Sequence, residues 1–202
     1  MNNIYYISQG NSPKEHLENI KNVVESGVKL IQLRMKNTEQ EIFFETAVEA
    51  KIICDSNNAQ LVINDNVEVA KTINSYGLHI GKEDMKPLDA RAILSEETLI
   101  GGTANTIEDC RFLATQKVNY IGLGPFRFTN TKKKLSPILG LEGYQQIISQ
   151  LRKEGIELPV YAIGGITKND FPELYATGVH GIAVSGILSN KPVKEIKELI
   201  AS

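Results

Sequence analysis

Several features that define large classes of protein are missing from the sequence. Among its 202 residues there are 2 cysteines, Cys54 and Cys110, without a CxxC spacing, so neither a disulfide framework nor a zinc site is expected. Both thiols are predicted to be buried as small hydrophobes. No apolar run approaches the ~20 residues that cross a bilayer, and the first residues show no basic region followed by an apolar stretch. These absences predict a soluble, cytoplasmic protein with no membrane partner.

An excess of charge of one sign is missing as well. The 22 Lys and Arg residues against 24 Asp and Glu give a net charge of −2, which excludes a generally basic surface for nucleic acid. Any strong anion site must therefore be local. No Pro-, Gly- or Ser-rich linker interrupts the chain, and a length near the ~150 residues of an average domain predicts one domain over residues 1–202.

The sequence contains a regular alternation of short apolar runs and longer amphipathic ones. The apolar runs, each too short for a helix, are residues 4–8, 30–33, 61–63, 77–80, 99–101, 120–123, 160–163 and 181–184. The amphipathic runs are residues 13–26, 39–56, 67–75, 87–94, 107–116, 141–154, 168–176 and 193–200. Eight strand–helix repeats of about 25 residues predict an α/β fold, a small closed (β/α)₈ TIM barrel. A doubly wound open sheet is the alternative, which the missing GxGxxG after the first strand disfavours.

Polar residues alternate with apolar ones at the end of the second predicted strand. In residues 31–36 a period of two places Gln32, Arg34 and Lys36 on one side. At the carboxyl end of a barrel strand that side is the active-site mouth, so two cations and an amide would point at substrate. The alternative is a solvated edge strand, which a sheet of buried parallel strands disfavours.

Two carboxylates follow the third and fourth predicted strands. Asp65 comes directly after Asn64, and Asp84 ends the segment 81–84, so neighbouring barrel strands would bring both to one rim. Two carboxylates beside cations suggest Mg²⁺, which takes one or two carboxylates and completes its shell with water and phosphate oxygens. The alternative is that Asp65 caps the helix near Val67 and that Asp84 caps or solvates a loop.

The later loops contain residues typical of phosphate sites. Thr103 follows two glycines at the fifth strand, where close backbone approach is possible and its hydroxyl can donate. The loop after the sixth strand carries Thr129, Thr131 and Lys132, and this set of short donors and charge suits a pyrophosphate.

The last two predicted strands are followed by Gly164-Gly165 and Val184-Ser185. Loops at these positions, beside a helix N-terminus, form the common phosphate cradle of barrels. We therefore expect a phosphate site here that is separate from the cations of the second strand. The alternative is that the glycine pair is purely structural.

The predicted rim combines a pyrophosphate site with Mg²⁺ and a site for a phosphate monoester, without an evident nucleophile or general base. The histidines at positions 16, 79 and 180 are interpreted as structural or surface residues. Departure of pyrophosphate from an activated carbon needs charge neutralisation more than proton transfer. Isomerisation of a sugar phosphate needs a placed acid and base instead, so the residues favour a transferase.

Taken in order, these motifs resemble thiamine phosphate synthases over essentially the whole chain. The matching motifs are Gln-Leu-Arg-Met-Lys at 32–36, Ile-Asn-Asp at 63–65, Gly-Lys-Glu-Asp at 81–84, Gly-Leu-Gly-Pro at 122–125, Thr-Asn-Thr-Lys at 129–132 and Ala-Ile-Gly-Gly-Ile at 162–166. The resemblance implies a barrel that joins hydroxymethylpyrimidine diphosphate to hydroxyethylthiazole phosphate, or its carboxylated form. The products would be thiamine phosphate and pyrophosphate.

The resemblance also implies roles for individual residues. The pyrimidine diphosphate would bind to Gln32, Arg34, Lys36 and Asn64, and one Mg²⁺ would bind to Asp65 and Asp84. The pyrophosphate and thiazole would face Thr129, Thr131 and Lys132, and the thiazole phosphate would bind at Gly165, Val184 and Ser185. The residues expected to act in catalysis are Arg34, Lys36, Thr103 and Lys132.

Three positions depart from the family pattern. Thr103 stands where serine is frequent, Lys82 stands where glutamine is usual, and Arg127 is an additional cation; each cation would either strengthen anion binding or be solvated. The closest alternative is the thiazole tautomerase branch, which places a catalytic histidine where this chain has Gly124-Pro125. A non-catalytic phosphate-binding barrel is the alternative from another class. A homo-oligomer formed through the outer helices is compatible with each of these.

Overall fold

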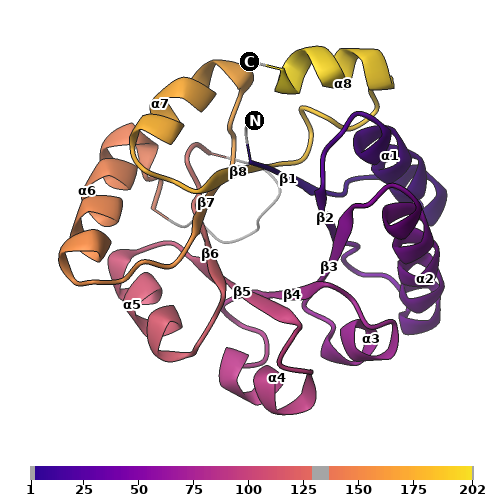
Figure 1. Ribbon diagram of the computed structural model, residues 1–202, viewed down its shortest axis with the longest axis horizontal. Coiled ribbons are helices and arrows are strands. Elements are labelled where there is room, and N and C mark those ends of the chain that lie inside the picture. The colour runs from indigo at the N-terminus through magenta and orange to yellow at the C-terminus, as the bar shows by residue number, and fades with distance from the viewer. Residues whose placement is uncertain (1–2, 129–136, 202) are drawn as a thin grey trace.

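Within residues 3–128 and 137–201, the part that the computed structural model describes, every strand pairs in parallel with the next along the chain (Figure 1). The strands are β1 (Ile4–Ile7), β2 (Leu30–Leu33), β3 (Gln60–Asn64), β4 (Gly77–Ile80), β5 (Leu99–Ala104), β6 (Tyr120–Leu123), β7 (Val160–Ile163) and β8 (Gly181–Val184). β8 also pairs with β1, with Ile182 opposite Ile4, so the sheet closes. The predicted (β/α)₈ TIM barrel is confirmed.

Helices follow the strands and form a ring outside the barrel (Figure 1). They are α1 (Pro13–Glu25), α2 (Gln40–Ser56), α3 (Val67–Thr72), α4 (Pro87–Ile93), α5 (Ile107–Thr115), α6 (Gly140–Lys153), α7 (Phe171–Ala176), which follows the 3₁₀ turn η1 (Lys168–Asp170), and α8 (Val193–Ile200). Local sequence explains both ends of α1. Ser12 Oγ accepts the Glu15 N–H at its start, and Gly27, with φ +106°, follows its end.

Alternation along each strand divides the side chains between the barrel interior and an outer layer. Outward residues such as Ile31 and Leu78 are fully buried in the layer between strands and helices. Tyr5 and Tyr120 belong to a separate buried cluster, and their rings pack edge to face with centroids 5.9 Å apart. Because these rings come from β1 and β6, on different sides of the barrel, this second cluster fills the interior.

The glycines at the fifth strand serve packing. β5 extends further than predicted and includes Gly101, Gly102 and Thr103. A Cβ on Gly101 would lie 2.0 Å from the Tyr120 ring, and one on Gly102 would lie 2.4 Å from Leu113. The two glycines therefore leave space for neighbouring side chains, a packing role in place of the close approach of the backbone to a ligand that the sequence suggested.

The two cysteines are buried as predicted. Cys54 on α2 and Cys110 on α5 are free thiols with no exposed surface. Burial raises the pKa of each to about 12, so both remain neutral and act as small core hydrophobes. In the described part of the chain, we find no helix with the length and apolar character to cross a membrane.

Candidate functional site

A cavity of about 590 Å³, here named the upper cavity, lies at the carboxyl ends of the strands. Its lining includes five of the predicted site residues, namely Arg34, Lys36, Gly165, Val184 and Ser185. The residues of the two expected anion sites therefore line one cavity. The reason is topological, because β2, which precedes the cations, and β8, which precedes Ser185, are both neighbours of β1.

Arg34 and Lys36 follow the end of β2, with Arg34 partly buried and Lys36 exposed. Burial lowers the pKa of Arg34, and the negative charge of Asp65 opposes that shift. The Arg34 N–H donates to Ser8 Oγ at 3.0 Å, and this oxygen lies 2.8 Å from His16 Nδ1. His16 thus supports the backbone beside Arg34. In the described part of the chain, no hydrogen bond or ion pair engages either cationic head, so both remain available to an anion.

Asp65 and Asp84 converge on one backbone group. The Gly81 N–H lies 3.2 Å from Asp65 Oδ1 and 3.1 Å from Asp84 Oδ2. Asp65 does not cap the following helix, because Asn66 Oδ1 accepts the Val69 N–H at the start of α3. With φ +61°, Asp65 instead turns the chain at the rim of the barrel.

This carboxylate pair fits a divalent cation. The pKa of Asp65 is raised to about 6 by burial and by the adjacent Asp84 carboxylate, against the opposing charge of Lys36. A divalent cation between the two carboxylates would remove their repulsion. The described residues contain no group of three or more His, Cys, Asp or Glu side chains that could hold a metal. Two carboxylates are the number that Mg²⁺ commonly takes from a protein, with water and phosphate oxygens completing its shell.

Gln32 and Thr103 lie deeper in the barrel and are joined by a chain of hydrogen bonds. Gln32 Nε2 donates to Tyr5 OH at 2.6 Å, and Tyr5 OH lies 2.9 Å from Tyr120 OH. His79 continues the chain, with Nδ1 3.2 Å from Tyr120 OH and Nε2 3.0 Å from Thr103 Oγ1. If each group donates to the next, starting at Gln32, then Thr103 accepts from His79 and keeps its own proton for a group at the mouth.

His79 is a site neighbour that the sequence analysis missed. Its side chain is buried as expected, but its Nε2 contacts the hydroxyl that was predicted to act on substrate. The signal was present in the alternation of β4. Leu78 and Ile80 belong to the outer layer, so the residue between them must face the barrel interior beneath the site.

The two additional cations are both engaged in ion pairs within the protein. Lys82 Nζ lies 2.7 Å from Asp109 Oδ2 on α5. Arg127 forms two bonds of 2.5 Å to the Asp170 carboxylate. The sequence left two roles open for these cations, anion binding and simple solvation. Neither role applies, because each cation is paired with a carboxylate of the protein. Each cation instead links its own loop to the next strand–helix unit.

Of the remaining predicted residues, the structure describes Asn64 but not the three in the loop after β6. Asn64 is placed beside the carboxylate pair, with its Nδ2 donating to Asp65 Oδ2 at 2.5 Å. Thr129, Thr131 and Lys132 lie outside the residues that the structure describes. Their roles toward pyrophosphate and thiazole therefore stay predictions.

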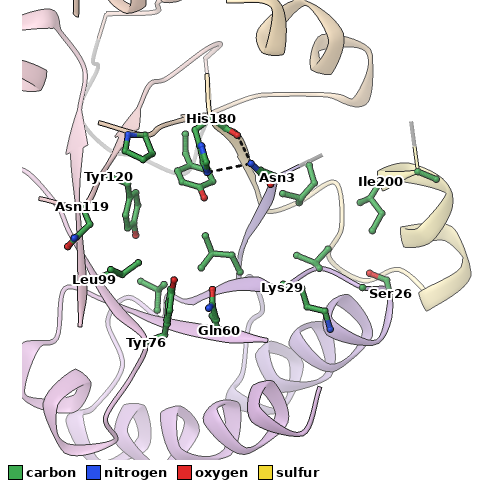
Figure 2. A pocket seen from close by; sticks show the side chains of 18 of the residues that line it. Asn3, Ser26, Lys29, Gln60, Tyr76, Leu99, Asn119, Tyr120, His180 and Ile200 are labelled. Carbon is green, nitrogen blue, oxygen red and sulfur yellow. Dashed lines mark hydrogen bonds between the residues drawn. The ribbon is translucent and has the colours of Figure 1, made fainter. Parts of the chain in front are cut away.

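A second cavity of about 640 Å³, here named the lower cavity, opens where the strands begin (Figure 2). Its lining includes Tyr120 together with several aliphatic side chains. Two of the polar side chains at this end are bonded within the protein. Lys29 Nζ donates to Asn57 O at 2.6 Å, and the Asn3 amide donates to His180 O at 3.0 Å. The lining also includes Gln60, Tyr76 and Lys197, but five of the predicted site residues line the upper cavity, and we place the functional site there.

Comparison with known proteins shows the family to which the chain belongs. The family model for thiamine monophosphate synthase matches residues 4–188. A thiamine-phosphate synthase of Flavobacterium johnsoniae is 51% identical over 195 residues, covering 96% of this chain and 92% of that protein, and one of Bacteroides fragilis is 44% identical, covering 99% of each. The solved thiamine phosphate pyrophosphorylase of Pyrococcus furiosus has a TM-score of 0.82 at 27% identity, covering 98% of this chain and 96% of that one. The chain therefore belongs to the thiamine monophosphate synthase family.

Proposed function

We propose that the upper cavity joins hydroxymethylpyrimidine diphosphate to hydroxyethylthiazole phosphate, the activity for which the relatives are named. The bond between the pyrimidine methylene carbon and the diphosphate oxygen breaks, and its electron pair leaves with pyrophosphate. The thiazole nitrogen forms the new C–N bond with its lone pair, which gives thiamine phosphate. No proton moves at the reacting atoms, so a nucleophile or general base is not needed.

One observation carries this proposal, namely the meeting of cations and carboxylates at one rim. Arg34 and Lys36 both interact electrostatically with Asp65, which itself lies beside Asp84. A diphosphate bound with a divalent cation needs both kinds of charge, because cations bind the phosphate oxygens while carboxylates hold the metal. Fixed charges of this kind lower the barrier by stabilising pyrophosphate as it leaves.

Different residues are proposed to bind the two substrates. Arg34 and Lys36 bind and orient the diphosphate, and Thr103 offers a hydroxyl proton at the mouth. Mg²⁺, held by Asp65 and Asp84, would polarise the diphosphate oxygens when bound. At the other side of the cavity, the residues for the thiazole phosphate are Gly165, Val184 and Ser185. The residues proposed to face both the pyrophosphate and the thiazole are Thr129, Thr131 and Lys132.

The direct test supplies purified protein with both substrates, with and without Mg²⁺. Thiamine phosphate, followed by fluorescence after oxidation, is expected only when the metal is present. Absence of product under every metal condition would exclude the synthase activity. Tautomerisation of the carboxylated thiazole phosphate alone would favour the tautomerase branch instead.

The metal site has its own test in the carboxylate pair. Asp65→Ala and Asp84→Ala should each raise the Mg²⁺ concentration for half-maximal activity by about tenfold or more, because each removes a proposed ligand. Asp89→Asn, an exposed carboxylate in the first turn of α4, is the matched control and should leave that concentration unchanged. Unchanged metal dependence in both alanine variants would show that the metal binds elsewhere.

A further inference from the structure

Arg127 holds both carbonyl groups of the glycine turn that follows β7. Its backbone N–H donates to Gly164 O at 2.9 Å, and its guanidinium Nη1 donates to Gly165 O at 3.2 Å. Both glycines adopt the left-handed backbone conformation, with φ +98° and +67°. The two carbonyls are thereby fixed toward the loop after β6.

Fixing these carbonyls also aims two amides. In a trans peptide group the C=O and the following N–H point to opposite sides, so the N–H groups of Gly165 and Ile166 point away from Arg127. The loop after β6 lies on one side of β7, and β8 lies on the other. Residues 164–166 line the upper cavity together with Ser185, which follows β8. The Arg127 contacts therefore turn backbone donors toward the side where an anion would meet them.

Asp170 in turn fixes Arg127. Its carboxylate accepts from Arg127 Nη1 and Nη2 at 2.5 Å, and from the N–H and hydroxyl of Thr167 at 2.8 Å. The Asp170 side chain is only 8% exposed, against 49% for Arg127, so the carboxylate is the more rigid partner. The Phe126 ring supports the guanidinium, whose carbon lies 4.5 Å from the ring centroid.

The loops after β6 and β7 touch closely beside this ion pair. A Cβ on Gly165 would lie 2.8 Å from Arg127 Cβ, and one on Gly164 would lie 2.7 Å from Pro125 Cβ. No space for a further side chain remains between these described residues. A change in the position of Arg127 is therefore passed directly to the glycine turn.

We propose that Arg127 and Asp170 are positioning residues for the phosphate group of the thiazole substrate, and that neither touches it. Together they hold the Gly165 and Ile166 amides toward a phosphate monoester in the upper cavity. The charge of Arg127 is neutralised by Asp170 rather than offered to the ligand. This inference rests on the proposed function, which places the thiazole phosphate at the glycine turn.

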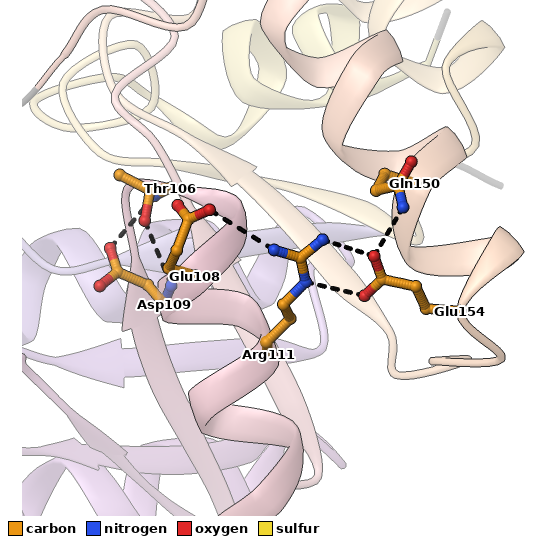
Figure 3. Close-up of polar contacts among 6 residues, drawn as sticks. All are labelled: Thr106, Glu108, Asp109, Arg111, Gln150 and Glu154. Carbon is orange, nitrogen blue, oxygen red and sulfur yellow. Dashed lines mark hydrogen bonds and ion pairs between the residues drawn. The ribbon is translucent and has the colours of Figure 1, made fainter.

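A second arginine–carboxylate pair provides a matched control (Figure 3). Arg111 on α5 donates to Glu154, directly after α6, through Nε at 2.8 Å and Nη2 at 2.5 Å. Its side chain is 44% exposed, close to the value for Arg127. Both pairs link consecutive strand–helix units, but Arg111 lies on α5 and Glu154 at the end of α6, so their loss should affect stability without affecting the glycine turn.

The test compares Arg127→Ala, Asp170→Asn and Arg111→Ala by steady-state kinetics, thermal unfolding and calorimetric titration with hydroxyethylthiazole phosphate. The first two variants should raise the KM and the Kd for this substrate by about tenfold, as expected when a supporting residue is lost. The KM for the pyrimidine diphosphate should change by less than about twofold, because its proposed site is held by other residues. Arg111→Ala should leave all three constants unchanged.

Asp170→Asn distinguishes positioning from a direct charge contact. This change releases the guanidinium from its carboxylate partner while an amide oxygen remains for the Thr167 donors. An arginine that bound the phosphate itself would then bind it more tightly, whereas a positioning role predicts weaker binding. Tighter binding by Asp170→Asn, or an equal loss in Arg111→Ala, would overturn the proposal.

Measuring thiazole phosphate binding and thiamine phosphate formation separately distinguishes failure of this proposal from failure of the proposed function. If the wild-type protein bound the thiazole phosphate but formed no thiamine phosphate, the synthase activity would be excluded, and the calorimetric comparison would still decide the role of the ion pair. If the wild-type protein bound no thiazole phosphate, the positioning role would be overturned as well.

Discussion

The two ends of the barrel hold cavities of similar volume and opposite chemistry. The upper cavity, of about 590 Å³, contains Arg34 and Lys36, whose cationic heads form no hydrogen bond or ion pair with the described residues. The lower cavity, of about 640 Å³, is lined mainly by aromatic and aliphatic side chains, together with Lys29, which is bonded to a backbone carbonyl, and the exposed Lys197. Volume alone favours the lower cavity, whereas two neighbouring cations and a glycine turn favour the upper one as an anion site.

A layer of tyrosines separates the two ends. Tyr5, Tyr120 and Tyr161 pack edge to face, with ring centroids 5.4 to 5.9 Å apart. The Tyr120 and Tyr161 side chains line the lower cavity, while the hydroxyls of Tyr5 and Tyr120 belong to the hydrogen-bond chain that ends at Thr103. The same residues thus serve packing below and polar support above, which agrees with barrels in which the carboxyl ends of strands carry function and the amino ends carry stability.

The largest difference between the two ends is expected when one cation is removed from each end of β2. Arg34→Ala should lower kcat/KM by about 100-fold or more, because it removes a charge proposed to stabilise the leaving pyrophosphate. Lys29→Ala, at the start of the same strand, should change kcat/KM by less than about twofold, since its ammonium serves only a backbone carbonyl. Steady-state kinetics with both substrates measures the two effects. Equal losses would mean that the lower end also takes part in the reaction.

Glycine substitutions test the same contrast through packing. Gly101→Ala would place a methyl group 2.0 Å from the Tyr120 ring, so the free energy of unfolding should fall by about 2–3 kcal/mol. Gly186→Ala at the upper end would meet only Gln9 Oε1, at 3.4 Å, and should change that free energy by less than about 0.5 kcal/mol. Because Gly186 lines the upper cavity, the KM of the Gly186→Ala variant for the thiazole phosphate should rise several-fold. Urea unfolding and kinetics together check both variants, and a stable Gly101→Ala would contradict the packing role.

The sequence could predict the fold and the charged rim because both depend on local patterns. Alternating strand and helix periods reproduce each of the strands, and residues directly after strands must gather at one end of a parallel barrel. Arg34 and Asp65 were found in this way. That Arg34 and Ser185 line the same cavity follows from the closed strand order, in which β2 and β8 are both neighbours of β1.

Contacts between side chains that lie far apart in the sequence could not be predicted from the sequence. The pairing of Arg127 with Asp170 spans 43 residues and depends on how two loops meet, which no local pattern encodes. Gly101 was misinterpreted for the same reason, since the ring that requires its missing side chain belongs to Tyr120 on the next strand. His79 looked like a core residue because its hydrogen-bond partners come from two other strands.

The two ends should also lose stability at opposite extremes of pH. Burial raises the pKa of Tyr120 and Tyr161 in the barrel interior. A group whose pKa is higher in the folded state stabilises the fold below its unfolded pKa, near 10 for tyrosine, and that contribution is lost as the pH rises. Tyr120→Phe cannot ionise at this position, so its unfolding free energy should fall less than that of the wild type between about pH 10 and pH 12. Urea unfolding at several pH values measures this difference, and parallel curves would contradict it.

At the upper end, stability is lost at low pH instead of high pH, and the expected change in unfolding free energy is smaller. The Arg127 guanidinium and the Thr167 donors hold the pKa of Asp170 at about 2, below the usual value near 4. The resulting stabilisation is present above about pH 4 and is lost as the pH falls through about 2. Asp170→Asn cannot titrate, so it should be about 1 kcal/mol less stable than the wild type above pH 4, with the difference vanishing near pH 2. A difference that stayed constant to pH 2 would mean that Asp170 stabilises by packing, and the upper loops would then resemble the lower end in depending on shape rather than charge.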